Sequence, residues 1–207
     1  MGSKGRAELE YWHGRSEDEG SELRTHPDWP RFYTQHFGLD VSFYDGKRIL
    51  DVGCGPRGSL EWATKAAERV GIDPLVGAYA QLGAEKHAMT YVEAGAESIP
   101  LESGHFDVVT CFNALDHVDD LDGAIAEMTR IASGDATLLL ITEVNHEPTA
   151  TEPQQFGWDV LERFAAWEVA WEKRNQKLDD IYGSLGADRE YRSGPGLLSA
   201  RLVRRRT

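Results

Sequence analysis

Short apolar runs alternate with longer, more polar segments between residues 48 and 144. The runs stand at 48–52, 70–73, 90–93, 106–112 and 136–144. Mostly apolar runs of this length predict strands that are covered on both faces. The segments 59–69, 79–88 and 121–132 have the composition or the residue spacing of helices. Strands alternating with helices at this interval predict an α/β fold, with a parallel sheet between two helical layers.

The alternation ends after residue 144. Residues 145–155 contain two prolines and predict a loop, and residues 158–166 have a helical composition. Two further strands are expected at 168–174 and 197–203. A polar stretch containing glycines separates them, which favours an antiparallel pair over another crossover unit. The whole pattern predicts a doubly wound, seven-stranded, mostly parallel sheet with an antiparallel last strand.

Composition and charge narrow the possible partners. The 207 residues carry 22 basic and 35 acidic side chains, a net charge of −13, which repels phosphate backbones. We therefore expect no nucleic-acid partner. The terminal arginines at 201, 204, 205 and 206 are interpreted as a solvated strand end. The two cysteines lack the spacing of a zinc site or a disulfide framework, and no apolar stretch is long enough to span a membrane. A cytoplasmic protein without a membrane partner is expected.

A glycine-rich segment follows the first expected strand: Asp51-Val52-Gly53-Cys54-Gly55-Pro56-Arg57-Gly58. Gly53 and Gly55 permit a tight turn and the close approach of a ligand. Asp73 stands about twenty residues further on, at the end of the second strand, where a carboxylate can accept hydrogen bonds from ribose hydroxyls. The segment thus predicts a site for a cofactor that carries adenosine. The alternative is a simple turn, with Asp73 capping a helix that begins at Pro74.

Asp51 distinguishes between two cofactors of this kind. NAD carries a pyrophosphate, which an acidic residue at the end of the strand opposes. S-adenosylmethionine carries a sulfonium and an ammonium group, which an acidic pocket favours. Asp51, the last acidic residue before the glycines, therefore favours S-adenosylmethionine.

Four motifs in order resemble those of the class I methyltransferases. Residues 48–55 (RILDVGCG) resemble the first motif, and residues 70–74 (VGIDP) resemble the second. Residues 94–101 (AGAESIPL) with 106–109 (FDVV) resemble the third and fourth, and residues 115–120 (LDHVDD) resemble the element that leads into the next helix. The similarity covers about residues 45–145. The type resembled is that of the small-molecule enzymes of ubiquinone and menaquinone biosynthesis.

This resemblance implies a Rossmann-like fold, S-adenosylmethionine as cofactor, a small-molecule acceptor, and a set of cofactor-binding residues. Gly53 and Gly55 approach the methionine part, with Asp51 near its ammonium group and Asn113 near the methyl group. Asp73 and Pro74 are assigned to the ribose, and Ala96 and Glu97 to the adenine. Many members have a third glycine where this chain has Arg57, so the loop is expected to differ there.

Two histidines are candidates for the catalytic base. His117 follows the fourth strand and His146 the fifth, both at the carboxyl edge of the sheet, where such sheets bind ligands. An imidazole titrates near neutrality and can accept the proton of a phenol or an amine. The alternatives are a capping or packing role for His117 and a solvated loop around His146. No metal is assigned, although a divalent ion held by residues 143–147 is a minor alternative.

The first 40 residues are polar with scattered aromatic side chains, and we expect one or two helices and loops there. Residues 41–207 form the cofactor-binding methyltransferase domain in this interpretation. Tyr11, Trp12 and His13 are candidates for a lid over the cofactor, since aromatic faces attract a sulfonium cation. Packing of these rings against the sheet is the alternative.

Two other functions remain open at this point. A non-catalytic protein that binds S-adenosylmethionine as a regulator or partner subunit would keep the same glycines. A nicotinamide-dependent oxidoreductase is disfavoured by Asp51 and by the lack of a Tyr-x-x-x-Lys pair. A nucleic-acid methyltransferase is disfavoured because residues 113–116 (NALD) stand where an Asn/Asp-Pro-Pro-aromatic motif is often found. The sequence carries no signal for the oligomeric state or for the atom that is methylated.

Overall fold

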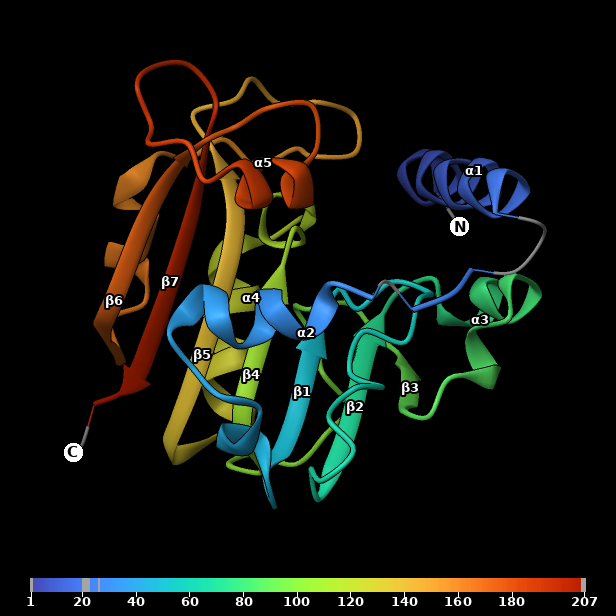
Figure 1. Ribbon diagram of the computed structural model, residues 1–207, viewed down its shortest axis with the longest axis horizontal. Helices are drawn as coiled ribbons and strands as arrows, with labels where there is room; N and C mark the ends of the chain where they lie inside the picture. Colours follow the sequence, from blue (N-terminus) through green and yellow to red (C-terminus); the bar gives the residue numbers. More distant parts are fainter. Residues whose placement is uncertain (1, 20–22, 26, 206–207) are drawn as a thin grey trace.

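A computed structural model describes residues 2–19, 23–25 and 27–205. Its centre is a seven-stranded sheet in the order β3-β2-β1-β4-β5-β7-β6 (Figure 1). The strands are β1 (Arg48–Val52), β2 (Glu68–Asp73), β3 (Thr90–Glu93), β4 (Phe106–Phe112), β5 (Ala132–Val144), β6 (Trp167–Gln176) and β7 (Gly196–Arg204). The five strands β1–β5 are parallel, and β7 is antiparallel to β5 and to β6. The α/β class, the seven strands and the antiparallel last strand are confirmed.

The strand order reverses between β1 and β4. From β1 the chain continues to β2 on one side, while β4 pairs with β1 on the other side. In open α/β sheets, ligands bind beyond the carboxyl ends of the strands at such a reversal. The loops that follow β1, β2 and β4 are therefore the ones to examine for a site.

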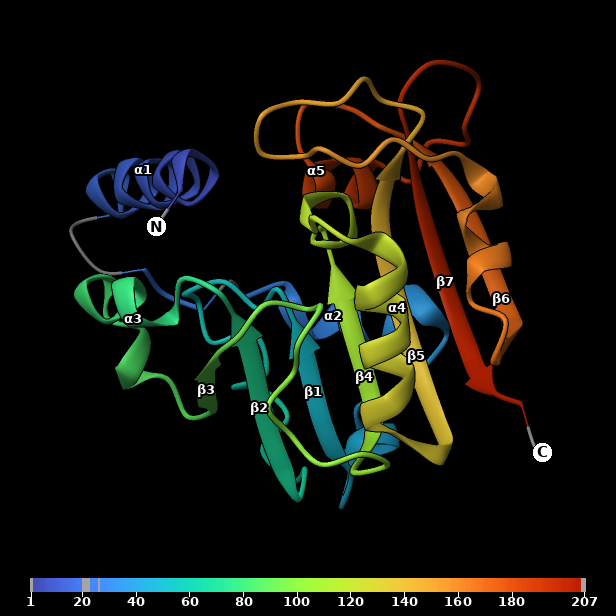
Figure 2. The same cartoon turned by 180° about the vertical axis from the view of Figure 1, so that it is seen from behind.

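Helices cover both faces of the sheet. On one face lies α4 (Leu121–Ile131), over β4 and β5 (Figure 2). The opposite face carries α2 (Trp29–Tyr33) and α5 (Ile181–Ala187), which contribute Trp29, Phe32 and Ile181 to one buried cluster (Figure 1). Two further helices, α1 (Ser3–Asp18) and α3 (Val76–Tyr79), lie beyond the carboxyl ends of β1–β3. The central strands β1, β4 and β5 are thus covered on both faces, as expected from their apolar sequences, whereas the edge strands β3 and β6 remain partly exposed.

The helix α4 illustrates how the sequence determines an element. The apolar spacing that predicts it is realised, with five side chains buried against the sheet: Leu121, Ala124, Ile125, Met128 and Ile131. The Asp120 carboxylate accepts a 3.0 Å hydrogen bond from the Gly123 N–H and caps the first turn. The expected bounds agree with the structure to within one residue.

The expected helix at 59–69 is wrong. Residues 59–67 form consecutive turns, and Glu68 and Arg69 already belong to β2. Aromatic side chains from residues 29–44, among them Tyr33 and Tyr44, join Ile49 in the cluster that covers this face of the sheet. Because that face is already covered there, the connection buries Leu60 and Ala63 in the cluster, packs Trp62 and Ala66 against it, and makes no full helix.

Other boundaries also differ from the expectation. The segment 79–88 is broken by Gly83, whose φ of 86° ends one 3₁₀ turn and begins the next. Residues 158–163 form a 3₁₀ helix, where a helix to 166 was expected. The helix α5 was not expected, because its seven residues lie in a polar stretch with two glycines.

The two ends of the chain can be compared with expectation only in part. In the first 40 residues α1 and α2 are the expected helices, while residues 1, 20–22 and 26 lie outside the described part. Arg201, Arg204 and Arg205 donate hydrogen bonds to backbone carbonyls of neighbouring segments, and Arg206 lies outside the described residues. Among the helices described, none has the length and apolar character needed to cross a membrane.

Candidate functional site

The glycine segment turns sharply at the carboxyl end of β1. Gly53 has a φ of 71°, and its N–H donates a 2.9 Å hydrogen bond to the Ile72 carbonyl of β2. A Cβ at Gly53 would lie 2.3 Å from the Cβ of Ala114, in the loop after β4. Both the φ angle and the close approach of this loop therefore require glycine.

Asp51 lies beneath this turn and is only 2% exposed. Three hydroxyl groups donate hydrogen bonds to its carboxylate: Thr110 at 2.5 Å, Tyr33 at 3.1 Å, and Ser59. Burial raises the pKa of Asp51 to about 6, and the hydrogen bonds from the hydroxyls oppose part of that rise. A cation placed next to this carboxyl group would favour its ionised form.

The carboxylate of Asp73 accepts hydrogen bonds from two backbone segments, the glycine segment after β1 and the turn after β2. Its Oδ2 accepts the Gly55 N–H at 3.2 Å, and its Oδ1 accepts the Leu75 N–H at 2.9 Å. Burial raises the pKa of Asp73 above its usual value. The bond to Leu75 places the carboxylate over the turn that begins at Pro74, so a ribose at Asp73 would compete with backbone donors.

The helix α1 covers the glycine segment. A Cβ added to Gly55 would lie 3.2 Å from the indole ring of Trp12, which also makes an edge contact with Tyr79 at 6.5 Å. The indole Nε1 of Trp12 is buried without a hydrogen-bond partner among the described residues. Of the residues expected at the lid, Trp12 therefore contacts the loop, whereas Tyr11 is largely exposed.

Arg57 holds α1 in this position. Its guanidinium donates to both carboxylate oxygens of Glu19, at 3.0 and 2.5 Å, and to the Arg24 carbonyl at 3.0 Å. It also lies 5.7 Å from the Trp12 ring centroid. The residue that replaces the third glycine thus connects the loop to the end of α1.

The remaining expected cofactor residues lie in the loops after β3 and β4. Glu97 accepts the Asp119 N–H at 2.8 Å, and Ala96 packs against the buried core. Asn113 adopts a left-handed conformation, with a φ of 52°, and its side chain is exposed at the end of β4. The structure brings these residues to the same edge of the sheet as the glycine segment.

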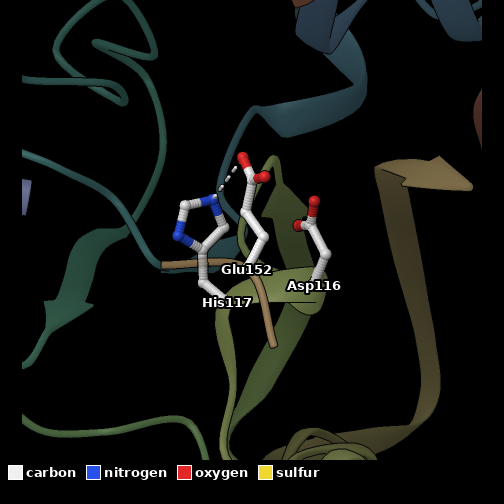
Figure 3. Close-up of side chains that lie close together, drawn as sticks. All are labelled: Asp116, His117 and Glu152. Carbon is white, nitrogen blue, oxygen red and sulfur yellow. Dashed lines mark ion pairs between the residues drawn. The ribbon is translucent and has the colours of Figure 1, made fainter. Parts of the chain in front are cut away.

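At this edge His117 lies close to two acidic residues, Asp116 and Glu152 (Figure 3), and the second candidate histidine, His146, lies beside Asp116. His117 Nε2 lies 3.8 Å from Glu152 Oε1, and His146 Nε2 lies 3.7 Å from Asp116 Oδ2. The sequence did not single out Asp116 or Glu152. Glu152 comes from the loop after β5, and only the fold brings this loop next to residues 116–117.

This cluster contains perturbed groups. Asp116 is completely buried, and burial raises its pKa to about 7. Burial also lowers the pKa of His117, which favours a neutral imidazole near pH 7. The Nε2 atoms of His117 and His146 and both carboxylate oxygens of Asp116 lack a hydrogen-bond partner among the described residues. A neutral imidazole of this kind is suited to accept a proton or to bind a metal ion.

A surface cavity of about 380 Å³ opens next to the loop after β5. Its lining comprises Asn145, Gln155, Phe156, Gly157, Asp159, Val160 and Arg163. It does not include the glycine segment, where Trp12 lies over Gly55. The cavity is thus separate from the loop assigned to the cofactor.

Comparison with known proteins links this edge of the sheet to a family. Residues 50–140 match the family described as "Methyltransferase domain". A demethylmenaquinone methyltransferase of Thermobifida fusca is 31% identical over 134 residues, which are 62% of this chain and 56% of that protein. A ubiquinone biosynthesis O-methyltransferase of Hahella chejuensis is 40% identical over 114 residues, 50% of this chain and 45% of that protein. The chain spans about half the length of the curated relatives it matches.

The fold of the chain also resembles that of a solved structure. The crystal structure of a putative methyltransferase from Bacillus halodurans superimposes with a TM-score of 0.63 at 17% sequence identity. The superposition covers 88% of this chain and all of that one. At such low identity the likeness concerns the architecture of the sheet and its helices.

Proposed function

We propose that this chain is a class I, S-adenosylmethionine-dependent methyltransferase that transfers the methyl group of S-adenosylmethionine to a small-molecule acceptor, since residues 50–140 match a methyltransferase family. The observation that carries the proposal is the glycine turn after β1, with the buried carboxyl groups of Asp51 and Asp73 beside it. Backbone that a ligand can approach, next to two acidic groups, suits an adenosine that carries a cationic methionine.

In this proposal the expected residues keep their roles. Gly53 and Gly55 contact the methionine part, and Asp51 balances its ammonium charge. Asp73 and Pro74 hold the ribose, Ala96 and Glu97 flank the adenine, and Asn113 lies near the methyl group. When bound, the cofactor supplies an already activated methyl group, so the protein mainly has to align it with the acceptor.

The N-terminal segment acts as a lid in the same proposal. Trp12 of α1 rests on Gly55, so α1 has to shift before the cofactor can reach the loop. After the shift, the indole ring remains close enough to contact a sulfonium cation through its π face. The Arg57–Glu19 contact would set how easily α1 moves.

The acceptor side of the site is formed by the loops after β4 and β5. An oxygen or nitrogen nucleophile has to lose a proton as its bond to the methyl carbon forms and the carbon–sulfur bond breaks. His117 is the proposed base because burial lowers its pKa, which leaves its Nε2 free to take that proton at neutral pH. His146 is the second candidate for this role, since its Nε2 is also free.

A small molecule is the favoured acceptor because of the charge of the chain. The net charge of −13 opposes binding of a nucleic acid. The two relatives named above carry names of quinone-biosynthesis methyltransferases, which are consistent with a small aromatic acceptor. Two free, buried cysteines suit the reducing cytoplasm as the place of action.

Calorimetric titration of the full chain with S-adenosylmethionine, its demethylated product and NAD tests this function. We expect micromolar binding of the first two, weakened at least tenfold by Asp73→Ala, and no binding of NAD. Asp135→Ala, an exposed residue near the amino end of β5 and thus at the end of the strand away from the site, is the matched control. Binding of NAD alone would indicate an oxidoreductase, and binding without turnover of any acceptor would indicate a regulatory protein.

A further inference from the structure

The side chains around Asp116 bring hydrogen-bond acceptor atoms close to one another, with no hydrogen-bond donor between them. Both oxygens of Asp116 and the Nε2 atoms of His117 and His146 are buried and have no hydrogen-bond partner among the described residues. Asp116 is 0% exposed and His146 is 9% exposed. Buried polar atoms without partners are costly, so several of them in one cluster indicate a missing positive charge.

The tautomer of His146 supports this interpretation. Its Nδ1 lies 3.0 Å from the carbonyl oxygen of Glu147, which accepts hydrogen bonds only, so Nδ1 carries the proton. The Nε2 atom of the neutral ring is then an acceptor, and it lies 3.7 Å from Asp116 Oδ2, another acceptor. Metal-binding histidines commonly have this arrangement, with one nitrogen bonded to a carbonyl and the other free for the ion.

His117 and Glu152 are oriented in a similar way. His117 Nδ1 lies 3.7 Å from the Glu8 carboxylate, while Nε2 lies 3.8 Å from Glu152 Oε1. The Thr149 hydroxyl donates to Glu152 Oε2 at 3.2 Å and leaves Oε1 directed toward His117 (Figure 3). The loop itself is held in place because the Gln154 N–H donates to the Asp116 carbonyl at 3.2 Å.

We propose that Asp116, His117 and Glu152 bind a divalent transition-metal ion, Zn²⁺ by preference, with His146 beside Asp116 as an additional nitrogen ligand. One ligand atom from each of the first three residues lies within 4.8 Å of the others. Metal–ligand bonds of about 2.0–2.2 Å place neighbouring ligand atoms roughly 3–4 Å apart, so closure around an ion brings the most distant pair together by at most about 1–2 Å.

The mixture of imidazole and carboxylate ligands determines the class of ion. Imidazole nitrogens suit Zn²⁺ and the neighbouring transition metals, whereas Mg²⁺ and Ca²⁺ prefer ligand sets made of oxygen. The competing explanation is that a proton occupies the cluster, as the raised pKa of Asp116 would allow. The two explanations differ in whether a metal ion binds.

The inference goes beyond methyl transfer and does not depend on it. With an ion bound, Nε2 of His117 is a metal ligand and no longer serves as the base; the ion would instead act as a Lewis acid at the sheet edge proposed for the acceptor and promote loss of the proton from an acceptor oxygen. Binding of the metal can be measured without S-adenosylmethionine, so a failure of the proposed function and a failure of this site give different results.

The experiment is calorimetric titration of the chelator-treated full chain with ZnCl₂, MnCl₂ and MgCl₂ separately, together with the visible spectrum after addition of CoCl₂. We expect one equivalent of Zn²⁺ to bind more tightly than Mn²⁺, and Mg²⁺ not to bind. Glu152→Gln and His117→Gln should each weaken Zn²⁺ binding at least tenfold and change the Co²⁺ spectrum. His105→Gln, at the opposite end of β4 and paired with Glu68, is the matched control.

Three results would overturn the proposal: no saturable Zn²⁺ binding, unchanged binding in Glu152→Gln and His117→Gln, or an equal loss in His105→Gln. Asp116→Asn is a less suitable test because the residue is completely buried. Glu152 lies in a partly exposed loop, with 28% of its side chain accessible, so Glu152→Gln should fold normally. Circular dichroism of each variant verifies this before the titration.

Discussion

At the scale of single residues, the site depends on a buried carboxyl group. Asp51 accepts hydrogen bonds from Tyr33, Ser59 and Thr110, which come from three different segments of the chain. These hydroxyls stabilise the ionised form but do not fully replace water, so burial still raises the pKa of Asp51 to about 6. The unliganded protein therefore holds a group that an ammonium cation would help to ionise.

This raised pKa predicts a pH dependence of stability. The folded state binds a proton at Asp51 more tightly than the unfolded state, so the free energy of unfolding should fall as pH rises from about 4 through 6. A shift of roughly two pKa units corresponds to about 3 kcal/mol. Chemical denaturation of the wild type and of Asp51→Asn at several pH values in this range measures the free energy of unfolding of each. We expect that of the wild type to fall relative to that of the variant as pH rises. A constant difference would contradict the prediction.

The close approach at Gly53 gives a second prediction at this scale. Gly53→Ala combines an unfavourable positive φ with a Cβ only 2.3 Å from Ala114. Gly46 has the same φ of 71° but open space around it, so Gly46→Ala isolates the backbone cost of about 1 kcal/mol. We expect Gly53→Ala to lower the free energy of unfolding by at least about 2 kcal/mol more than Gly46→Ala, as measured in urea. Equal losses would mean that the loop after β4 moves away without cost.

At the scale of elements, α1 is the helix that most affects access to the glycine segment, because it lies over it. It is 16 residues long, yet Ser16 is its one residue with a buried side chain. Its contacts with the rest of the molecule include Trp12 on Gly55, Lys4 on Asp119, and the bonds of Glu19 just after the helix. A helix that buries so little and covers a ligand-binding edge is well suited to open and close.

Arg57→Met tests whether the contact with Glu19 holds this helix closed. A charge-assisted, two-pronged hydrogen bond that is largely shielded from water contributes about 1.5–3 kcal/mol. Its loss should accelerate amide hydrogen exchange in α1 and association with S-adenosylmethionine by roughly tenfold. Arg15→Met removes only the 3.6 Å pair that half-exposed Arg15 forms with Glu19, and should change both rates little. Equal rates in the two variants would indicate that Arg57 does not restrain α1.

The elements also show how far the sequence predicts this fold. Strands such as β1 and β4 have the expected bounds, because buried parallel strands are short apolar runs. The expected helix at 59–69 is absent because aromatic side chains from residues 29–44 cover the sheet there, a long-range effect that local composition does not report. The short α5 was missed for the opposite reason, since its seven residues include two glycines within a longer polar stretch and its support comes from packing against α2.

The candidate site was predictable to a similar degree. Asp51, Gly53 and Asp73 stand in motifs at the ends of strands, so the topology alone brings them together. His117 and His146 were found because they follow strands β4 and β5. Glu152 lies eight residues beyond the end of β5, in a loop whose course is set by the hydrogen bonds of Gln154 and Thr149. Such loop courses have no periodic signal in the sequence.

At the scale of the whole molecule, the two ends of the chain contribute very differently to stability. The last strand, β7, pairs with β5 on one side and with β6 on the other. Its side chains Leu197, Leu198 and Leu202 are completely buried. The first helix, α1, lies beyond the edge of the sheet and buries little (Figure 1). The fold is therefore closed by its last strand, while its first helix is an accessory to the site.

Truncation at either end tests this division of roles. Ending the chain after residue 195 removes β7, leaves β6 without a neighbour and exposes the edge of β5, so we expect no cooperative thermal transition. Each completely buried leucine contributes about 2–3 kcal/mol, so the three together contribute about 6–9 kcal/mol, which is comparable to the whole stability of an ordinary domain, about 5–15 kcal/mol. Deletion of residues 2–18 should keep a cooperative transition with a melting temperature within a few degrees of wild type, as measured by circular dichroism. A cooperative transition without β7, or its loss without α1, would show that the helix and not the strand completes the core.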